Sequence, residues 1–239
     1  PTDCGRENRR RRRFGIICQM TDFSKLLNPE QCAAATAGDG PLLVLAAAGT
    51  GKTRTLVHRV AYLIERGVAP DRILLLTFTN RAAREMRERA EALVGDAVAS
   101  IWSGTFHSIC ARLLRRYGAG LGYQPGFQIL DEDDQKKIVG DLIKTTVKDP
   151  KDFVKKDFVA KMISEASNER RPVVDIARRW QTKTAGVYPD EIAEIATKYE
   201  ARKRELGAMD FDDLLVNGLK LLTSERTRRV REMLQEHFL

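Results

Sequence analysis

The sequence has no apolar run close to the roughly 18 residues that a membrane-spanning helix needs. Its first residues also lack the apolar core of a secretory signal, so we expect a cytoplasmic protein with no membrane partner. Cysteine is scarce, and the four residues show no C-x-x-C spacing, which argues against a zinc knuckle. A chain of 239 residues can bury its own core without a disulfide framework, so we expect reduced thiols.

The formal charge of +8 suits a polyanionic partner such as nucleic acid. Half of this excess lies in residues 1–19, where six arginines outnumber two acidic residues. That segment has no apolar pattern to bury, so we expect a disordered basic arm. It is either a nucleic-acid-binding arm or a translated upstream segment, and we favour the second because patterned sequence begins only after Met20.

Strand and helix patterns alternate over the first half of the chain. Short apolar runs at 42–47, 73–78 and 100–105 predict buried strands, and each is followed by an amphipathic helical pattern. Asn28 and Asn80 are expected to cap helices. Three β-to-α steps predict a parallel sheet with helices packed on its faces.

After Gly118 the pattern changes. A glycine- and proline-rich loop leads to a short apolar stretch at 127–130, and a charged helical pattern then runs to about residue 206. We therefore predict four segments: the arm at 1–19, an α/β domain at 20–117, a mainly helical domain at 118–206, and a return to the first domain at 207–239.

The segment 46–53 reads Ala-Ala-Ala-Gly-Thr-Gly-Lys-Thr and joins a predicted strand to a predicted helix. Backbone N–H groups of such a turn, together with the helix N-terminus, bind phosphate oxygens. Lys52 would place a cation near the β- and γ-phosphates of ATP, and the Thr53 hydroxyl would hold Mg²⁺. The predicted nucleotide-binding residues of this loop are Ala46, Ala47, Ala48, Gly49, Thr50, Gly51, Lys52 and Thr53.

Gln31 lies upstream of the loop, and its amide is suited to recognise adenine, although a glutamine on a helix is ordinarily a surface residue. The guanine signature Asn-Lys-x-Asp is absent, which argues against a GTPase. Two further segments follow predicted strands, at the sheet edge where ligands bind. Their aromatic rings could stack on unpaired bases or could simply pack in the core. The candidate DNA-binding residues are Thr77, Phe78, Thr79, Asn80, Thr105, Phe106 and His107.

Asp131 and Glu132 imitate the strand-borne acidic pair that binds Mg²⁺ in P-loop enzymes. Gln128 interrupts the apolar run before them, and Asp131 is better explained as the cap of an acidic helical turn. We therefore favour the capping role.

Five segments in order resemble the motifs of UvrD/PcrA/Rep-like superfamily 1 DNA helicases, over about residues 24–239. They are Leu-Asn-Pro-Glu-Gln at 27–31, the loop at 46–53, Thr-Phe-Thr-Asn-Arg-Ala-Ala-Arg-Glu-Met at 77–86, Gly-Thr-Phe-His at 104–107 and Asp-Phe-Asp-Asp-Leu-Leu at 210–215.

The resemblance implies a RecA-like P-loop domain with an inserted helical subdomain at about 118–206. It implies an ATP- and Mg²⁺-dependent motor that moves 3′ to 5′ on single-stranded DNA and acts at single-strand/duplex junctions. By position, Gln31 would contact adenine, Lys52 would be catalytic, and Arg54 would lie beside the nucleotide. The residues at 77–80 and 105–107 would contact DNA.

Two departures from the family pattern are informative. The family has Ala-Gly-Ala-Gly at the start of the loop, whereas Ala47 stands in place of the first glycine; its methyl group fits only if φ is negative. The chain also stops before the family's Asp-Glu strand and second motor domain, and hydrolysis needs residues that position water and stabilise the phosphoryl group. We therefore expect an N-terminal helicase fragment that is inactive alone. One alternative is a complete, non-catalytic, nucleotide-gated DNA-binding module. Another is a P-loop kinase, although the sequence marks no site for the phosphate acceptor that a kinase needs.

Overall fold

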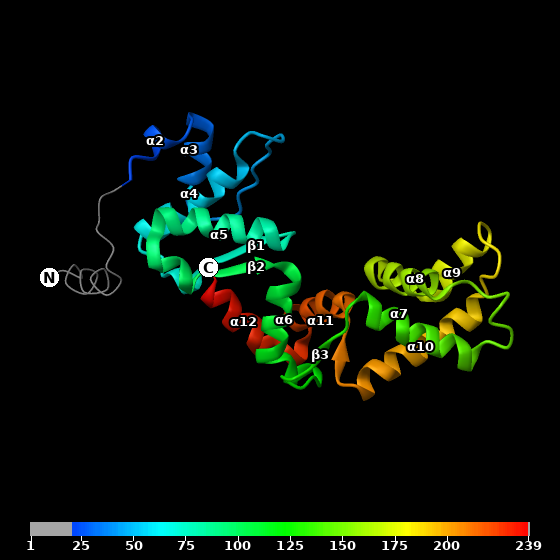
Figure 1. Cartoon of the computed structure of the whole chain (residues 1–239). Helices are drawn as coiled ribbons and strands as arrows, with labels where there is room; N and C mark the ends of the chain where they lie inside the picture. The colour runs from blue at the N-terminus through cyan, green and yellow to red at the C-terminus, as the bar shows by residue number, and fades with distance from the viewer. Residues whose placement is uncertain (1–20, 239) are drawn as a thin grey trace. The chain divides into compact units, whose positions relative to one another are not determined.

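The structure is a computed structural model that describes residues 21–238, so the predicted basic arm at 1–19 lies outside the described residues (Figure 1). The described chain forms two compact units, residues 21–109 with 235–238 and residues 110–234. The division falls inside α6 (Phe106–Tyr117) and α12 (Arg228–His237). Each unit combines helices with a small parallel sheet.

The first unit contains two of the three predicted strand-to-helix steps, β1 (Leu74–Thr77) to α5 (Asn80–Val94) and β2 (Trp102–Thr105) to α6. Its remaining elements are α2 (Phe23–Leu26), α3 (Pro29–Ala35) and α4 (Lys52–Glu65), with 3₁₀ turns at Pro70–Arg72 and Gly95–Ser100. β1 and β2 pair in parallel, with Leu74 opposite Trp102 and Thr77 opposite Thr105, so both strands end at the same edge. α5 packs against α4 and both strands (Figure 1).

The core of this unit comes from one face of each helix and from the strands. Val57 and Val60 of α4 are almost fully buried against Leu75 of β1 and Ala90 of α5. Fully burying a side chain such as valine stabilises the fold by about 1.5–3 kcal/mol, so the apolar spacing of α4 and α5 explains why these helices cover the strands.

The strand predicted at 42–47 is wrong, because the structure assigns no strand there. Leu43 and Leu45 are 82% and 86% exposed. A strand needs neighbouring backbone to satisfy its N–H and C=O groups, and in the part of this unit that the structure describes only β1 and β2 pair with each other. Without a pairing partner, this apolar run therefore lies outside the sheet and stays exposed to solvent.

Helix caps follow the sequence with one correction. The side chain of Asn28 accepts a hydrogen bond from the Gln31 N–H and forms a capping box at α3, as predicted. The cap of α5 is Thr79 instead of Asn80, since the Thr79 hydroxyl accepts from the Ala82 N–H at 3.1 Å. The cap lies one residue earlier than predicted because Thr79 has the extended backbone conformation that an N-cap residue needs.

The second unit is mainly helical. Its elements, besides the parts of α6 and α12, are β3 (Gln128–Ile129), α7 (Glu132–Thr146), α8 (Lys156–Glu169), α9 (Val173–Gln181), α10 (Pro189–Glu205), β4 (Ala208–Met209) and α11 (Phe211–Thr223), with 3₁₀ turns at Gly118–Leu121 and Glu225–Thr227. β3 and β4 pair in parallel, and apolar faces of α7, α8, α9 and α10 share one core around Ile192 and Tyr199. The structure places residues 207–234 in this unit, whereas the sequence predicted their return to the first domain.

Asp131 caps α7. Its side chain accepts hydrogen bonds from the Asp133 and Asp134 N–H groups, both at 2.9 Å. The favoured interpretation of this acidic pair is therefore confirmed, because the carboxylate is already committed to the first turn of a helix.

Candidate functional site

The loop at 46–53 turns through two left-handed glycines. Gly49 has φ +79° and Gly51 has φ +82°, conformations that an L side chain rarely adopts. Ala47 is not among the described residues with positive φ, so its methyl group fits the turn. Gly51 is the N-cap of α4 and offers no side-chain cap, which leaves first-turn N–H groups open to an anion.

Lys52 begins α4 and turns back over the loop. Its Nζ atom donates to the carbonyl oxygens of Ala46 at 3.1 Å and Ala47 at 2.7 Å. The Thr50 hydroxyl donates to the same Ala47 oxygen at 2.8 Å. The ammonium therefore already lies within the loop, where phosphate oxygens would replace carbonyl oxygens as its acceptors.

Hydrogen bonds connect α2 and α3 to the loop and to α4. Gln31 Nε2 donates to the Thr50 carbonyl at 2.9 Å. Arg54 Nη2 donates to the Leu26 carbonyl from the first turn of α4. The structure thus places Gln31 against the loop, whereas Arg54 contacts the backbone of α2. Thr53, on the same turn, is half-buried.

The aromatic residues after β1 and β2 form an exposed pair. The Phe78 and Phe106 ring centroids lie 5.6 Å apart, with planes tilted by 43°. Phe78 is 90% exposed and Phe106 is 42% exposed, so the alternative that these rings pack in the core is wrong. Apolar rings so exposed at a strand edge are suited to stack on planar partners.

The polar residues around this pair hold the turns that position it. Thr77 Oγ1 donates to the Thr79 carbonyl at 3.1 Å, and Thr105 Oγ1 accepts from the Ser108 N–H at 3.2 Å. Thr77 and Thr105 are buried, whereas Asn80 is exposed and His107 is half-buried. The buried threonines therefore shape the edge, and the exposed side chains present it to solvent.

No group of three His, Cys, Asp or Glu side chains that could hold a metal occurs within residues 21–238. The Thr53 hydroxyl fits a magnesium ion of the kind that binds mostly through water and substrate phosphates. A metal at this loop would therefore come with the nucleotide, and Thr53 would supply the protein ligand.

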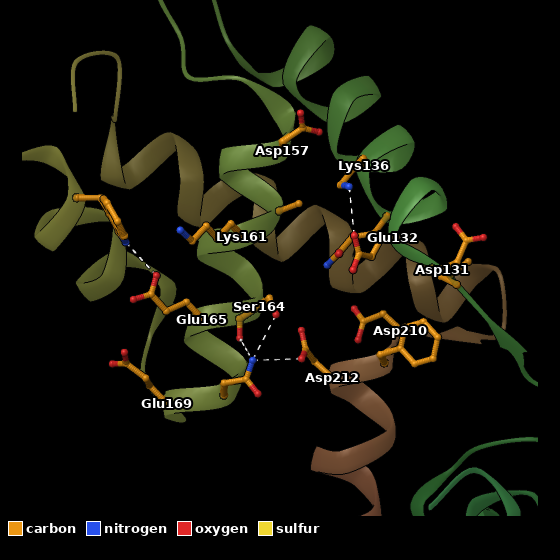
Figure 2. Close-up of a pocket in the computed structure, with 16 residues that line it drawn as sticks. Asp131, Glu132, Lys136, Asp157, Lys161, Ser164, Glu165, Glu169, Asp210 and Asp212 are labelled. Carbon is orange, nitrogen blue, oxygen red and sulfur yellow. Dashed lines mark hydrogen bonds and ion pairs between the residues drawn. The ribbon is translucent and has the colours of Figure 1, made fainter. Parts of the chain in front are cut away.

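A cavity of about 750 Å³ lies in the second unit and contains none of the predicted site residues (Figure 2). Its walls carry many carboxylates, including Asp131, Asp157 and Glu169, which would repel a triphosphate. Asn168 Nδ2 donates to the Ser164 carbonyl at 2.9 Å and lies 3.3 Å from Asp212 Oδ1. The charge of this cavity therefore does not suit a nucleotide.

Sequence reasoning missed a buried ionic cluster in the same unit. Lys203 Nζ lies 2.9 Å from Asp210 Oδ2, 2.6 Å from Asp213 Oδ2 and 2.7 Å from Glu200 Oε1. Tyr199 OH donates to Asp210 Oδ2 at 3.0 Å. The signal in the sequence is the acidic run at 210–213, which lies a few residues after Lys203.

Opposing effects set the pKa values in this cluster. Burial alone would lower the pKa of Lys203, but Asp210, Asp213 and Glu200 raise it above its ordinary value. Burial and the neighbouring Asp210 raise the pKa of Asp213 to about 6, although Lys203 opposes them. Neighbouring carboxylates raise both pKa values, but burial adds to the shift of Asp213 and opposes the shift of Lys203.

A profile of the UvrD/REP helicase N-terminal domain matches residues 27–239. The chain belongs to this family, which confirms the resemblance found in the motifs. It is similar to the ATP-dependent DNA helicase PcrA of Staphylococcus aureus strain Mu50, with 42% identity over 216 residues that cover 89% of this chain and 28% of that protein. PcrA of Bacillus subtilis strain 168 is 41% identical over 214 residues, with the same coverage.

The chain spans 28% of the length of these PcrA relatives, so it corresponds to an N-terminal part of a helicase. Within the described residues, every helix is too short or too polar to cross a bilayer.

Proposed function

We propose that this chain is the N-terminal ATP- and single-stranded-DNA-binding part of a 3′ to 5′ DNA helicase or translocase. The observation that carries the proposal is the exposed Phe78–Phe106 pair at the carboxyl ends of β1 and β2. It belongs to the same compact unit as the phosphate loop, so one body would hold both nucleotide and DNA.

In this proposal the first unit is the start of a RecA-like P-loop domain, and residues 118–206 form a helical subdomain inserted into it. Lys52 and the N–H groups at the start of α4 hold the phosphates of ATP. Thr53 holds Mg²⁺, and Gln31 meets adenine. Phe78 and Phe106 stack on bases, while Thr79, Asn80 and His107 lie beside the strand. A cytoplasmic location remains part of the proposal.

ATP binding is tested by titrating the 239-residue chain with ATP and Mg²⁺ in a calorimeter. We expect Lys52→Ala to weaken binding at least tenfold, because it removes the cation beside the phosphates. Lys25→Ala is the matched control, since Lys25 is exposed on α2 and its ion pair within residues 21–238 is with Asp22. Equal affinities for all three proteins would contradict an ATP site at the loop.

DNA binding is tested by fluorescence anisotropy with a labelled oligothymidylate. Stacking on an aromatic ring is worth about 1–3 kcal/mol per base, so Phe78→Ala should weaken binding about 5- to 150-fold. Because Phe78 is 90% exposed, the substitution should leave the melting temperature unchanged. Leu93→Ala replaces another exposed apolar residue, on α5, and should have no effect on the anisotropy.

We further propose that this chain binds ATP without turning it over, because the residues that would activate water and stabilise the phosphoryl group belong to the longer helicase. An ATPase assay with single-stranded DNA checks this. Turnover that disappears in Lys52→Ala would show that the chain is catalytically complete.

A further inference from the structure

The side-chain amide of Gln31 hydrogen-bonds to the phosphate loop at 46–53. Nε2 donates to the Thr50 carbonyl at 2.9 Å, while Oε1 accepts from the Asn28 N–H at 3.3 Å. The second bond belongs to the capping box of α3, which holds the glutamine in place. A rigidly held donor therefore contacts one carbonyl of the loop.

That carbonyl belongs to the Thr50–Gly51 peptide, which is trans, as are all described peptides. In a trans peptide the C=O and the following N–H point in opposite directions. A bond that directs the Thr50 oxygen toward Gln31 thus directs the Gly51 N–H to the opposite side. This N–H is a donor at the start of α4, of the kind that binds phosphate oxygens.

The peptide needs such a restraint because glycines lie close on both sides of it. Gly49 and Gly51 both adopt left-handed conformations with positive φ, and glycine populates conformations with negative φ about as readily. The contact is also close. A Cβ atom at Gly51 would lie 2.7 Å from Gln31 Nε2, so only glycine lets the amide approach the loop.

We propose that Gln31 is a positioning residue of the phosphate loop: by holding the Thr50 carbonyl, it orients the Gly51 N–H for a phosphate oxygen. Such positioning would favour the binding of any triphosphate, with or without a base. The inference rests on the proposed binding of ATP at the loop. The amide keeps a second hydrogen on Nε2 and a second lone pair on Oε1. It therefore can meet adenine while it holds the loop, and it couples base recognition to phosphate binding.

The test uses inorganic tripolyphosphate, which has no base, as the probe and Gln31→Met as the variant. Methionine is uncharged and of similar length, but it cannot donate to Thr50. We expect the full 239-residue chain with Gln31→Met to bind tripolyphosphate about three- to tenfold more weakly than wild type, as for the loss of one hydrogen bond. ATP should weaken by at least the same factor.

Asn28→Ala is the matched control. It removes the other half of the capping box, the bond from the Gln31 N–H to Asn28 Oδ1 at 2.8 Å, but leaves the amide able to reach Thr50. It should bind tripolyphosphate as wild type does. A second readout is the Gly51 amide resonance in a ¹H–¹⁵N spectrum, which should move in Gln31→Met without ligand and remain in place in Asn28→Ala.

The outcomes separate this inference from the proposed function. If wild type binds neither tripolyphosphate nor ATP, both fail. If wild type binds tripolyphosphate and Gln31→Met binds it equally well, only the positioning role fails. A loss confined to ATP, with tripolyphosphate unchanged, would identify Gln31 as an adenine contact alone and overturn the inference.

Discussion

Lys203 and Asp210 form a buried ion pair that joins α10 to α11, with Nζ 2.9 Å from Oδ2. The two side chains are only 4% and 7% exposed. Asp210 is also the N-cap of α11, in a capping box with Asp213. The acidic run at 210–213 therefore begins a helix and neutralises a buried cation with the same side chains.

Lys203→Met should destabilise the chain by about 3–5 kcal/mol, because removal of one partner leaves buried carboxylates uncompensated. Urea unfolding followed by circular dichroism measures the change. Lys198→Met on the same helix is the control: its pair with Glu194 is about half exposed, so we expect a change of about 0.5 kcal/mol or less. Equal losses in the two variants would contradict a special role for the buried pair.

Asp213 should make stability depend on pH in an unusual direction. Its folded pKa of about 6 exceeds the ordinary aspartate value of about 3.9, so between these values the folded chain binds a proton that the unfolded chain does not. Its contribution to the free energy of unfolding therefore rises as pH falls from 7 to 5. Asp213→Asn should be more stable than wild type at pH 7.5 by about 1–2 kcal/mol, with the gap about halved at pH 5 and closed only under about pH 4, below the unfolded pKa. A gap independent of pH, measured by urea unfolding, would rule this out.

Gly218 on α11 lies directly against Cys110. A Cβ atom there would be 2.6 Å from the Cys110 Sγ atom. Gly218→Ala should therefore lower the free energy of unfolding by about 1–3 kcal/mol through overpacking, even though alanine is the better helix former. In a Cys110→Ala background the loss should be smaller, because the Sγ contact is gone and the closest remaining contact is with the Cβ atom at 3.1 Å. A double-mutant cycle measures the coupling, and additive effects would show that the contact is relieved elsewhere.

Thr53→Val tests the predicted metal ligand. Wild-type affinity for ATP should fall about tenfold when EDTA removes Mg²⁺, since in our proposal the Thr53 hydroxyl would help to hold the metal that accompanies the phosphates. The variant lacks that hydroxyl, so its affinity should be low and nearly the same with and without EDTA. Thr182→Val, at an exposed position of the second unit, should respond to EDTA as wild type does. The readout is calorimetric titration with ATP.

Local chemistry was enough to predict many elements of the fold. The caps Asn28 and Asp131 are in place because a side-chain oxygen close to its own backbone N–H groups needs no distant partner. The parallel pairing of β1 with β2 was predictable from two β-to-α steps.

Long-range packing decided what local patterns left open. The apolar run at 42–47 has the composition of a strand, but a strand exists only where other backbone pairs with it. Phe78 could equally have been a core residue, and only the position of the β1–β2 edge exposes it. Lys203 reads as one more charge on a polar helix, yet the return of the chain through β4 to the start of α11 buries it among carboxylates that lie up to ten residues away. Hydrogen bonds within a turn can be predicted from neighbouring residues, whereas burial and ion pairing depend on which segments the fold brings together.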